Sequence, residues 1–456
     1  SIGFRTPPED STGVAHILEH SVLCGSERFP VKEPFVELVK GSLNTFLNAM
    51  TYPDKTIYPV ASCNDKDFAN LMEVYLDAVF FPNIYNRKEI FLQEGWHYEL
   101  EDTAADLSYN GVVYSEMKGA FSSPDQVMYA EIQQNLFPDT AYGVESGGDP
   151  DHIPELTYEQ FLEFHKRYYH PVNSYIYLYG DMDVEERLTY MDKEYLSRFE
   201  EITLDSSLAE QKPFDKKKCA ESFYSVNTEE EAKDAAYFAY NVAMDGERDL
   251  VRDTAMSLLC TALVNTPGAP VKQALTAAGI GEEVYAMYCD EYLQPFFSLV
   301  AQNAPADAGD EFMRIATETM ENCVKEGVNK KSLLAALNSM EFSFREADCG
   351  SYPKGLRYGQ LMLVTWLYDD TQVFNNMHWS PVFDKLRELI DTDYFEKLLQ
   401  ESILDNTHGA FLKLLPKVGM LAEKEEKQKE AEKAKKKEEK KKDEKKPEGG
   451  KKEKKK

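Results

Sequence analysis

The sequence predicts an α+β protein with two similar domains in series, each an antiparallel sheet with helices packed on one face. Three observations support this class. The 456 residues are enough for roughly two or three domains, each with its own core. Segments with helical periodicity alternate with short strand-like segments in both halves of the chain. A polar stretch at residues 203–218 interrupts this alternation, so we expect domains at 1–205 and 216–418.

The first half opens at residues 1–10 with the end of a strand that enters a turn. A helix is expected over residues 12–23, with Gly25 placed to end it. The pattern then predicts helices at 34–43, 65–82, 111–121, 124–137 and 157–169, and strands at 56–62 and 173–182. Helices and strands are thus interleaved within one unit, as expected for an α+β domain.

The second half repeats this general order, although no repeat is visible letter by letter. Strands are expected at 235–244 and 296–304, and helices at 253–263 and 310–327. From about residue 421 onward the chain is mostly Lys, Glu and Ala without an apolar stripe. We therefore expect residues 419–456 to form a charged linker or tail, either disordered or a solvated helix.

The charge of the chain excludes some classes of partner. The formal net charge is −29, and residues 423–456 contain 17 Lys and 11 Asp or Glu, which leaves −35 on the rest. A body this acidic repels nucleic acid and anionic lipid and attracts cationic ligands, including basic peptides.

No apolar run is long enough for a membrane span. Seven scattered cysteines favour a reducing intracellular compartment, the cytoplasm first, with the mitochondrial matrix or another organelle as alternatives.

The stretch GVAHILEHSVLCG, residues 13–25, contains the pattern most typical of a catalytic site. On a helix, His16, Glu19 and His20 lie at i, i+3 and i+4 and project from one face. Two imidazoles one turn apart can supply two zinc ligands. A glutamate beside them can take a proton from zinc-bound water and pass it to a leaving amine. The alternative is an ordinary helix surface that carries two histidines.

A catalytic zinc site also needs a third protein ligand and an open position for water. Glu94 in FLQEGWHYEL and Glu116 in GVVYSEMKGAF are both candidates, and spacing alone does not choose between them. His97, which lies between two aromatic residues, is better suited to a packed and hydrogen-bonded role.

The motif belongs to a longer series of segments that resemble one family. The chain resembles the inverted-zincin metallopeptidases of the pitrilysin and insulinase type, with the presequence proteases as the nearest branch. The resemblance covers most of the first domain and continues more weakly in NTPGAPVKQALTAAGIGEEV of the second. The segments that carry it are FRTPPEDSTGVAHILEHSVLCGS, SLNTFLNAMTYPDKTIYPVAS, VYLDAVFFP, EGWHYELE, GVVYSEMKGAF, SGGDPDHIPELTYEQF and YYHPVNSYIYLYGD.

The resemblance implies one Zn²⁺ per chain, with His16 and His20 as ligands and Glu19 as the general base. The family's third ligand lies in an NEMKG-like segment, which reads SEMKG here, so Glu116 is implied rather than Glu94. The implied function is a zinc endopeptidase that degrades unstructured peptides such as targeting presequences. A zinc-bound water activated by Glu19 would attack the peptide carbonyl.

The resemblance also implies how a peptide and a partner would bind. Substrate adds as a strand to a sheet edge, for which Asn48 and Ala49 in FLNAMT are the candidates. Family members are about twice this length and close as two halves around a chamber. We therefore expect a C-terminal half or a second subunit to complete the chamber, and weak activity from this chain alone. The alternative is a non-catalytic structural or partner-binding subunit of a processing-type complex.

Overall fold

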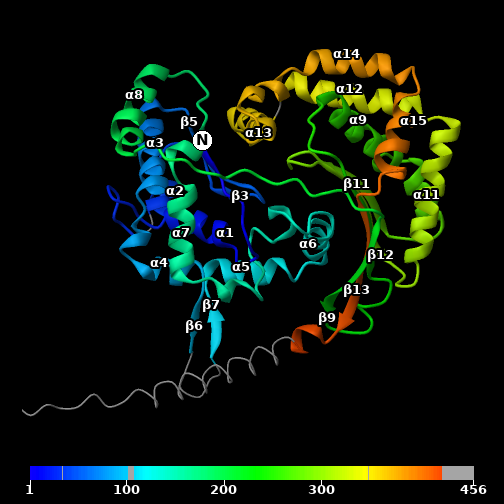
Figure 1. Ribbon diagram of the computed structural model, residues 1–456, viewed down its shortest axis with the longest axis horizontal. Coiled ribbons are helices and arrows are strands. Elements are labelled where there is room, and N and C mark those ends of the chain that lie inside the picture. The colour runs from blue at the N-terminus through cyan, green and yellow to red at the C-terminus, as the bar shows by residue number, and fades with distance from the viewer. Residues whose placement is uncertain (33, 101–106, 348, 424–456) are drawn as a thin grey trace, which may run out of the picture.

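The computed structural model describes residues 1–32, 34–100, 107–347 and 349–423, and its two α+β domains lie side by side (Figure 1). Residues 201–214, at the predicted boundary, contain neither helix nor strand. The predicted tail lies outside the described residues, except for its first few positions, of which 420–423 are helical. Among the described residues, no helix is both long and apolar enough to cross a membrane.

The first domain is built on a four-stranded antiparallel sheet in the order β3-β4-β1-β8. Its strands are β1 (Ile2–Arg5), β3 (Met50–Thr51), β4 (Lys55–Tyr58) and β8 (Ser174–Ile176). The strand predicted at 56–62 is split at Pro59, because proline has no N–H to continue a ladder. Its second part, β5 (Val60–Ser62), pairs instead with β2 (Asn44–Leu47), and β3 is left at an edge of the sheet.

The helices predicted in the first half are all present, with boundaries shifted by a few residues. They are α1 (Val14–Val22), α2 (Pro34–Gly41), α3 (Asp65–Phe80), α5 (Val112–Ala120), α6 (Pro124–Leu136) and α7 (Tyr158–Tyr168). The structure adds two helices and a hairpin, namely α4 (Lys88–Glu94), α8 (Val184–Glu194), β6 (His97–Glu99) and β7 (Ser108–Asn110). Helix α1 is central, since Ile17, Leu18 and Val22 are fully buried in the core of this domain.

The second domain has a five-stranded sheet in the order β11-β12-β10-β13-β9. The predicted strands are β10 (Ala236–Ala243) and β12 (Phe296–Ala304), and the structure adds β9 (Lys218–Val226), β11 (Glu283–Cys289) and β13 (Gly409–Val418). Pairing is antiparallel except between β13 and β9, which are parallel. The helices are α9 (Leu250–Cys260), α10 (Pro270–Ala277), α11 (Gly309–Glu326), α12 (Lys330–Glu346), α13 (Lys354–Trp366), α14 (Trp379–Ile390) and α15 (Tyr394–Leu399).

The helices of the second domain pack on one face of its sheet, as the sequence predicted, and a helix of the first domain covers the other face. One face carries the helices of its own domain, and Phe238 and Val242 of β10 are buried there. The other face receives α6 of the first domain, which inserts Met128, Ile132 and Leu136 against the sheet. Every residue of β10 is consequently buried, which is why its sequence is an almost continuous apolar run. Helix α6 thus docks the two domains against each other (Figure 1).

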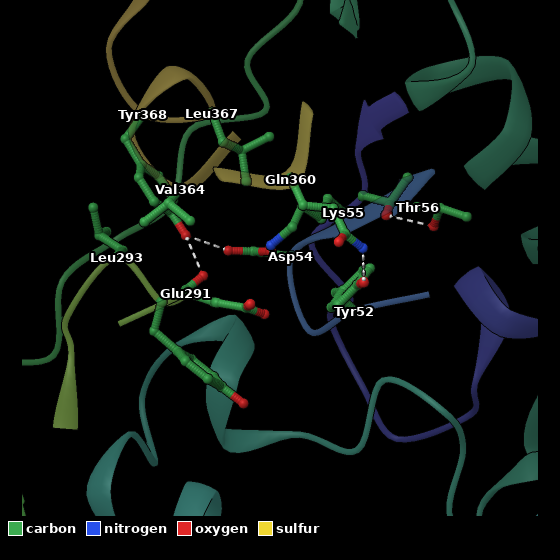
Figure 2. Close-up of polar contacts among 12 residues, drawn as sticks. Tyr52, Asp54, Lys55, Thr56, Glu291, Leu293, Gln360, Val364, Leu367 and Tyr368 are labelled. Carbon is green, nitrogen blue, oxygen red and sulfur yellow. Dashed lines mark hydrogen bonds and ion pairs between the residues drawn. The ribbon is translucent and has the colours of Figure 1, made fainter. Parts of the chain in front are cut away.

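Polar contacts centred on Asp54 also join the domains (Figure 2). Its carboxylate accepts a hydrogen bond from the Tyr368 hydroxyl at 2.5 Å, as Figure 2 shows. The same carboxylate accepts a second hydrogen bond from the Tyr142 hydroxyl at 2.7 Å. Its other oxygen lies 3.0 Å from the Lys55 ammonium. The Leu293 N–H donates to the Tyr142 hydroxyl at 3.0 Å, so the turn before β4 is tied to both domains.

A buried histidine in the first domain gives the fold a pH-dependent stability. His165 of α7 is 3% exposed and stacks on Tyr169 with ring centroids 4.7 Å apart. Its Nε2 lies 3.0 Å from the Val79 carbonyl, and its Nδ1 lies 2.8 Å from the Tyr85 hydroxyl. The carbonyl can only accept, so Nε2 carries the proton of a neutral ring. Burial lowers the pKa of His165 to about 4.

We expect stability to fall as the pH drops from about 6.5 to about 4, because the unfolded chain then binds a proton that the folded chain excludes. The loss attributable to His165 is of order 3 kcal/mol once the pH is below its folded pKa. Denaturant unfolding at a series of pH values, compared with His165→Gln, measures it. The variant should show a shallower dependence in this window, and an unchanged slope would contradict the assignment.

Candidate metal centre

The candidate metal centre is built on α1, where His16 and His20 stand one turn apart with ring centroids 5.0 Å apart. The helix begins after Gly13, whose φ of +70° suits glycine. A Cβ on Gly13 would lie only 2.7 Å from the Cα of Gly148. The loop that contains Gly147 and Gly148 can therefore lie directly against the start of the helix, next to His16.

Glu116 of α5 brings a carboxylate to both histidines. Its Oε2 lies 3.8 Å from the Nε2 of His16 and 3.8 Å from the Nε2 of His20. The three candidate ligand atoms all lie within 4.8 Å of one another. Tetrahedral zinc with bonds of about 2.1 Å places its ligand atoms about 3.4 Å apart, so the donors nearly match this geometry. The three groups supply three ligands and leave a fourth position for water. The Glu116 side chain is 53% exposed, so solvent reaches this side of the cluster.

Each histidine is held through its other ring nitrogen. The Nδ1 of His16 lies 2.9 Å from the Gly147 carbonyl, which can only accept a hydrogen bond. The Nδ1 of His20 lies 3.4 Å from Oε2 of Glu94. Both contacts favour the tautomer that leaves the Nε2 lone pair directed toward Glu116, as metal-binding histidines require.

The geometry therefore gives the two candidate glutamates different roles. Glu94 is buried behind His20 and also accepts from Gln93 at 2.8 Å, whereas Glu116 shares the open side with the histidine Nε2 atoms. Burial raises the pKa of Glu94, but hydrogen bonds from His20 and Gln93 outweigh it and keep the pKa low. Burial likewise lowers the pKa of His20, and the contacts with Glu94, Glu19 and Glu116 more than reverse this.

Replacing Glu94 by glutamine should weaken zinc binding by about 10- to 100-fold without abolishing it, because the ligands stay while the anion that orients His20 is lost. Competition with a chromophoric zinc chelator measures the affinity. Glu89→Gln, an exposed glutamate on the same helix, is the matched control and should bind zinc like the parent chain. Equal affinities in the two variants would contradict this role for Glu94.

Glu19 lies on the same helix but is not one of the three clustered groups. Its residue is 8% exposed. Burial raises the pKa of Tyr75, and the neighbouring Glu19 carboxylate raises it further. The Tyr75 hydroxyl in turn donates to the Asn48 carbonyl at 3.4 Å. Glu19 is therefore next to the metal ligands in the helix and linked through Tyr75 to the segment predicted to bind substrate.

Asn48 and Ala49 lie between β2 and the edge strand β3, which contacts α1. Asn48 is exposed, and its N–H donates to the Pro59 carbonyl at 3.3 Å. An edge strand beside the metal centre can accept an added strand. Substrate binding by these two residues stays a prediction.

Sequence reasoning missed Gly147, although the paired glycines of SGGDP signalled a close backbone contact.

Comparison with known proteins identifies the family of the chain. Residues 1–131 match the family model "Insulinase (Peptidase family M16)", and residues 155–340 match "Peptidase M16 inactive domain". The chain belongs to the M16 peptidase family. The candidate metal centre lies in the first matched region. Among the described residues, no second metal-binding group is found in the region that matches the inactive domain.

Relatives of this M16 chain include presequence proteases. It is 48% identical over 430 residues to Protein HypA of Clostridium perfringens, which covers 94% of this chain and 44% of that protein. It is 41% identical over 434 residues to Presequence protease 1, chloroplastic/mitochondrial, of Arabidopsis thaliana, which covers 93% of this chain and 40% of that protein. The chain thus spans less than half the length of these relatives.

Solved structures share the fold. A protease from Helicobacter pylori superposes with a TM-score of 0.70 at 15% identity, covering 91% of this chain and 92% of that one. Pitrilysin superposes with a TM-score of 0.60 at 16% identity, covering 91% of this chain and 42% of that one. At these identities the likeness concerns the fold.

Proposed function

We propose that this chain carries the active site of a zinc endopeptidase that degrades unstructured peptides, such as targeting presequences. The observation that carries the proposal is the convergence of His16, His20 and Glu116, with each histidine held through Nδ1, beside Glu19 and an open sheet edge. The relatives named presequence proteases support the substrate class. Their names and the scattered cysteines also support an intracellular or organellar compartment.

The residues of the chain divide the work of peptide hydrolysis. The edge strand β3 holds an extended peptide through backbone hydrogen bonds, which makes binding tolerant of sequence. Bound Zn²⁺ supplies a Lewis acid that polarises the peptide carbonyl and acidifies water. Glu19 accepts a proton from the attacking water and then donates it to the leaving amine. The Gly147 carbonyl and Glu94 hold the two imidazoles in place throughout.

The alternative, a non-catalytic subunit of a processing-type complex, is less well supported. A subunit without catalysis has no need for two imidazoles, a third carboxylate and a base in this arrangement. We further propose that efficient turnover depends on sequence corresponding to the remainder of the longer relatives, which would close the chamber over β3.

The test is metal content together with hydrolysis of a fluorogenic, unstructured basic peptide. We expect one zinc per chain, chelator-sensitive cleavage of the peptide and no cleavage of a tightly folded protein. Adding a polypeptide that corresponds to the rest of the relatives should raise the rate. A chain that binds no zinc, or cleavage that survives complete removal of metal, would overturn the proposal.

A further inference from the structure

A cavity of about 380 Å³ lies between the two domains, directly beside the metal centre. Met117, which follows the ligand Glu116, and Gly147, which holds His16, form one side of it. Thr51 of the edge strand β3 forms another, and α6 and the second domain close the rest. A peptide added along β3 alternates its side chains between the two faces of the sheet, so those on one face would meet this cavity.

The lining of the cavity is anionic. It includes the carboxylates of Asp54, Glu145 and Glu291 and a single cation, Lys55. Lys55 is paired with Asp54, whose carboxylate is also occupied by two tyrosine hydroxyls. Glu145 and Glu291 form no ion pair with any described residue. The Glu291 side chain points into the space near Asp54 and Tyr52 (Figure 2). Neither of these two carboxyl groups therefore has a cationic partner among the described residues.

Glu145 is the more informative of the two because it is buried. It is 8% exposed, and its Oε1 accepts the Gly147 N–H at 3.1 Å. A carboxylate removed from water without a cation is costly to keep ionised. Burial accordingly raises the pKa of Glu145, with only the Gly147 hydrogen bond opposing it. A cation that enters the cavity would offset this cost.

The shape of the lining indicates which kind of cation fits. The cavity carboxylates do not form a group of three whose oxygens lie within 4.8 Å, so among the described residues a second metal site is not built here. Aromatic walls are supplied by Tyr52, Tyr129 and Tyr292. The Lys55 ammonium already lies 4.7 Å from the Tyr52 ring centroid. An aliphatic stem with a cationic end suits such walls.

We infer that this interdomain cavity is a subsite for an arginine or lysine side chain of the peptide, with Glu145 and Glu291 as its anionic groups. The inference rests on the proposed function, since it places the peptide on β3. It explains how a chamber with backbone-based binding can still prefer basic peptides. The preference comes from two residues on opposite sides of the domain boundary rather than from the overall charge of the chain.

The test measures binding to the zinc-loaded chain with Glu19→Gln, so that peptides are not consumed. The probe is a labelled, unstructured peptide of Gly, Ser and Ala with one central Arg, and its twin carries Gln there. We expect the Arg peptide to bind about tenfold more tightly. Adding Glu145→Gln and Glu291→Gln should bring the ratio close to one, and the exposed Glu291→Gln alone should lower it in part.

The control removes the same charge elsewhere. Glu159→Gln with Glu163→Gln, both exposed on α7, should keep the tenfold ratio. An unchanged ratio in the cavity double variant, with zinc still bound, overturns the subsite and leaves the peptidase proposal standing. Failure of the parent chain to bind zinc, or to cleave either peptide when a polypeptide that corresponds to the rest of the relatives is added, overturns the proposed function and the subsite with it.

Discussion

Replacing Glu19 by glutamine will lower peptide turnover by about 100- to 10,000-fold and leave one zinc bound per chain. Glutamine has nearly the same shape but cannot accept the proton of the attacking water. Glu19 lies outside the cluster of His16, His20 and Glu116, so the metal should not depend on its charge. Activity should be measured with the fluorogenic peptide, and zinc content by atomic absorption on the same sample.

The control for the Glu19 experiment is Glu37→Gln, an exposed glutamate on the neighbouring helix α2, which should leave turnover unchanged. Measuring activity and zinc content on the same sample distinguishes a general base from a zinc ligand, because loss of a base lowers activity alone and loss of a ligand lowers both. A Glu19→Gln chain that loses its zinc would assign Glu19 to metal binding. A chain that keeps both zinc and full activity would mean that another group moves the proton.

The spacing of His16, Glu19 and His20 was sufficient to predict a shared helix face, because helical geometry is local. The third ligand is different, since Glu94 and Glu116 lie on separate helices whose packing against α1 decides which carboxylate faces Nε2 and which faces Nδ1. Only the resemblance distinguished them. The polar partner of His16 was beyond local reasoning because it is a backbone carbonyl 131 residues away.

The fold shows the same division between local and distant determinants. The helices that were predicted match the structure to within a few residues, but α4, α8, α10 and α12 to α15 were not predicted. Among the strands of the second domain, β11 was missed, and so were β9 and β13. These two strands pair in parallel from opposite ends of the second domain, and their register depends on contacts far apart in the sequence. Helix α6 was predicted, but its docking on the sheet of the other domain follows only from tertiary packing.

Replacing Glu116 by alanine should weaken zinc binding by about 1,000-fold or more, a larger effect than that of Glu94→Gln. The substitution removes one of the three protein ligands. The two imidazoles that remain are fewer than the three protein ligands that a catalytic zinc site needs. Because the Glu116 side chain is half exposed on α5, its removal leaves no buried cavity, and the chain should stay folded.

The effect is measured by zinc competition and by thermal unfolding with and without metal. A ligand that binds only the folded state raises its stability in proportion to the logarithm of its concentration above Kd. At free zinc about 100-fold above the parent Kd, which is still below the Kd expected for Glu116→Ala, zinc should therefore raise the Tm of the parent chain and of Glu89→Ala but not that of Glu116→Ala. If Glu116→Ala kept the full zinc-dependent shift, another group would have to be the third ligand. Glu94, which already contacts His20 through Nδ1, would be the first to test.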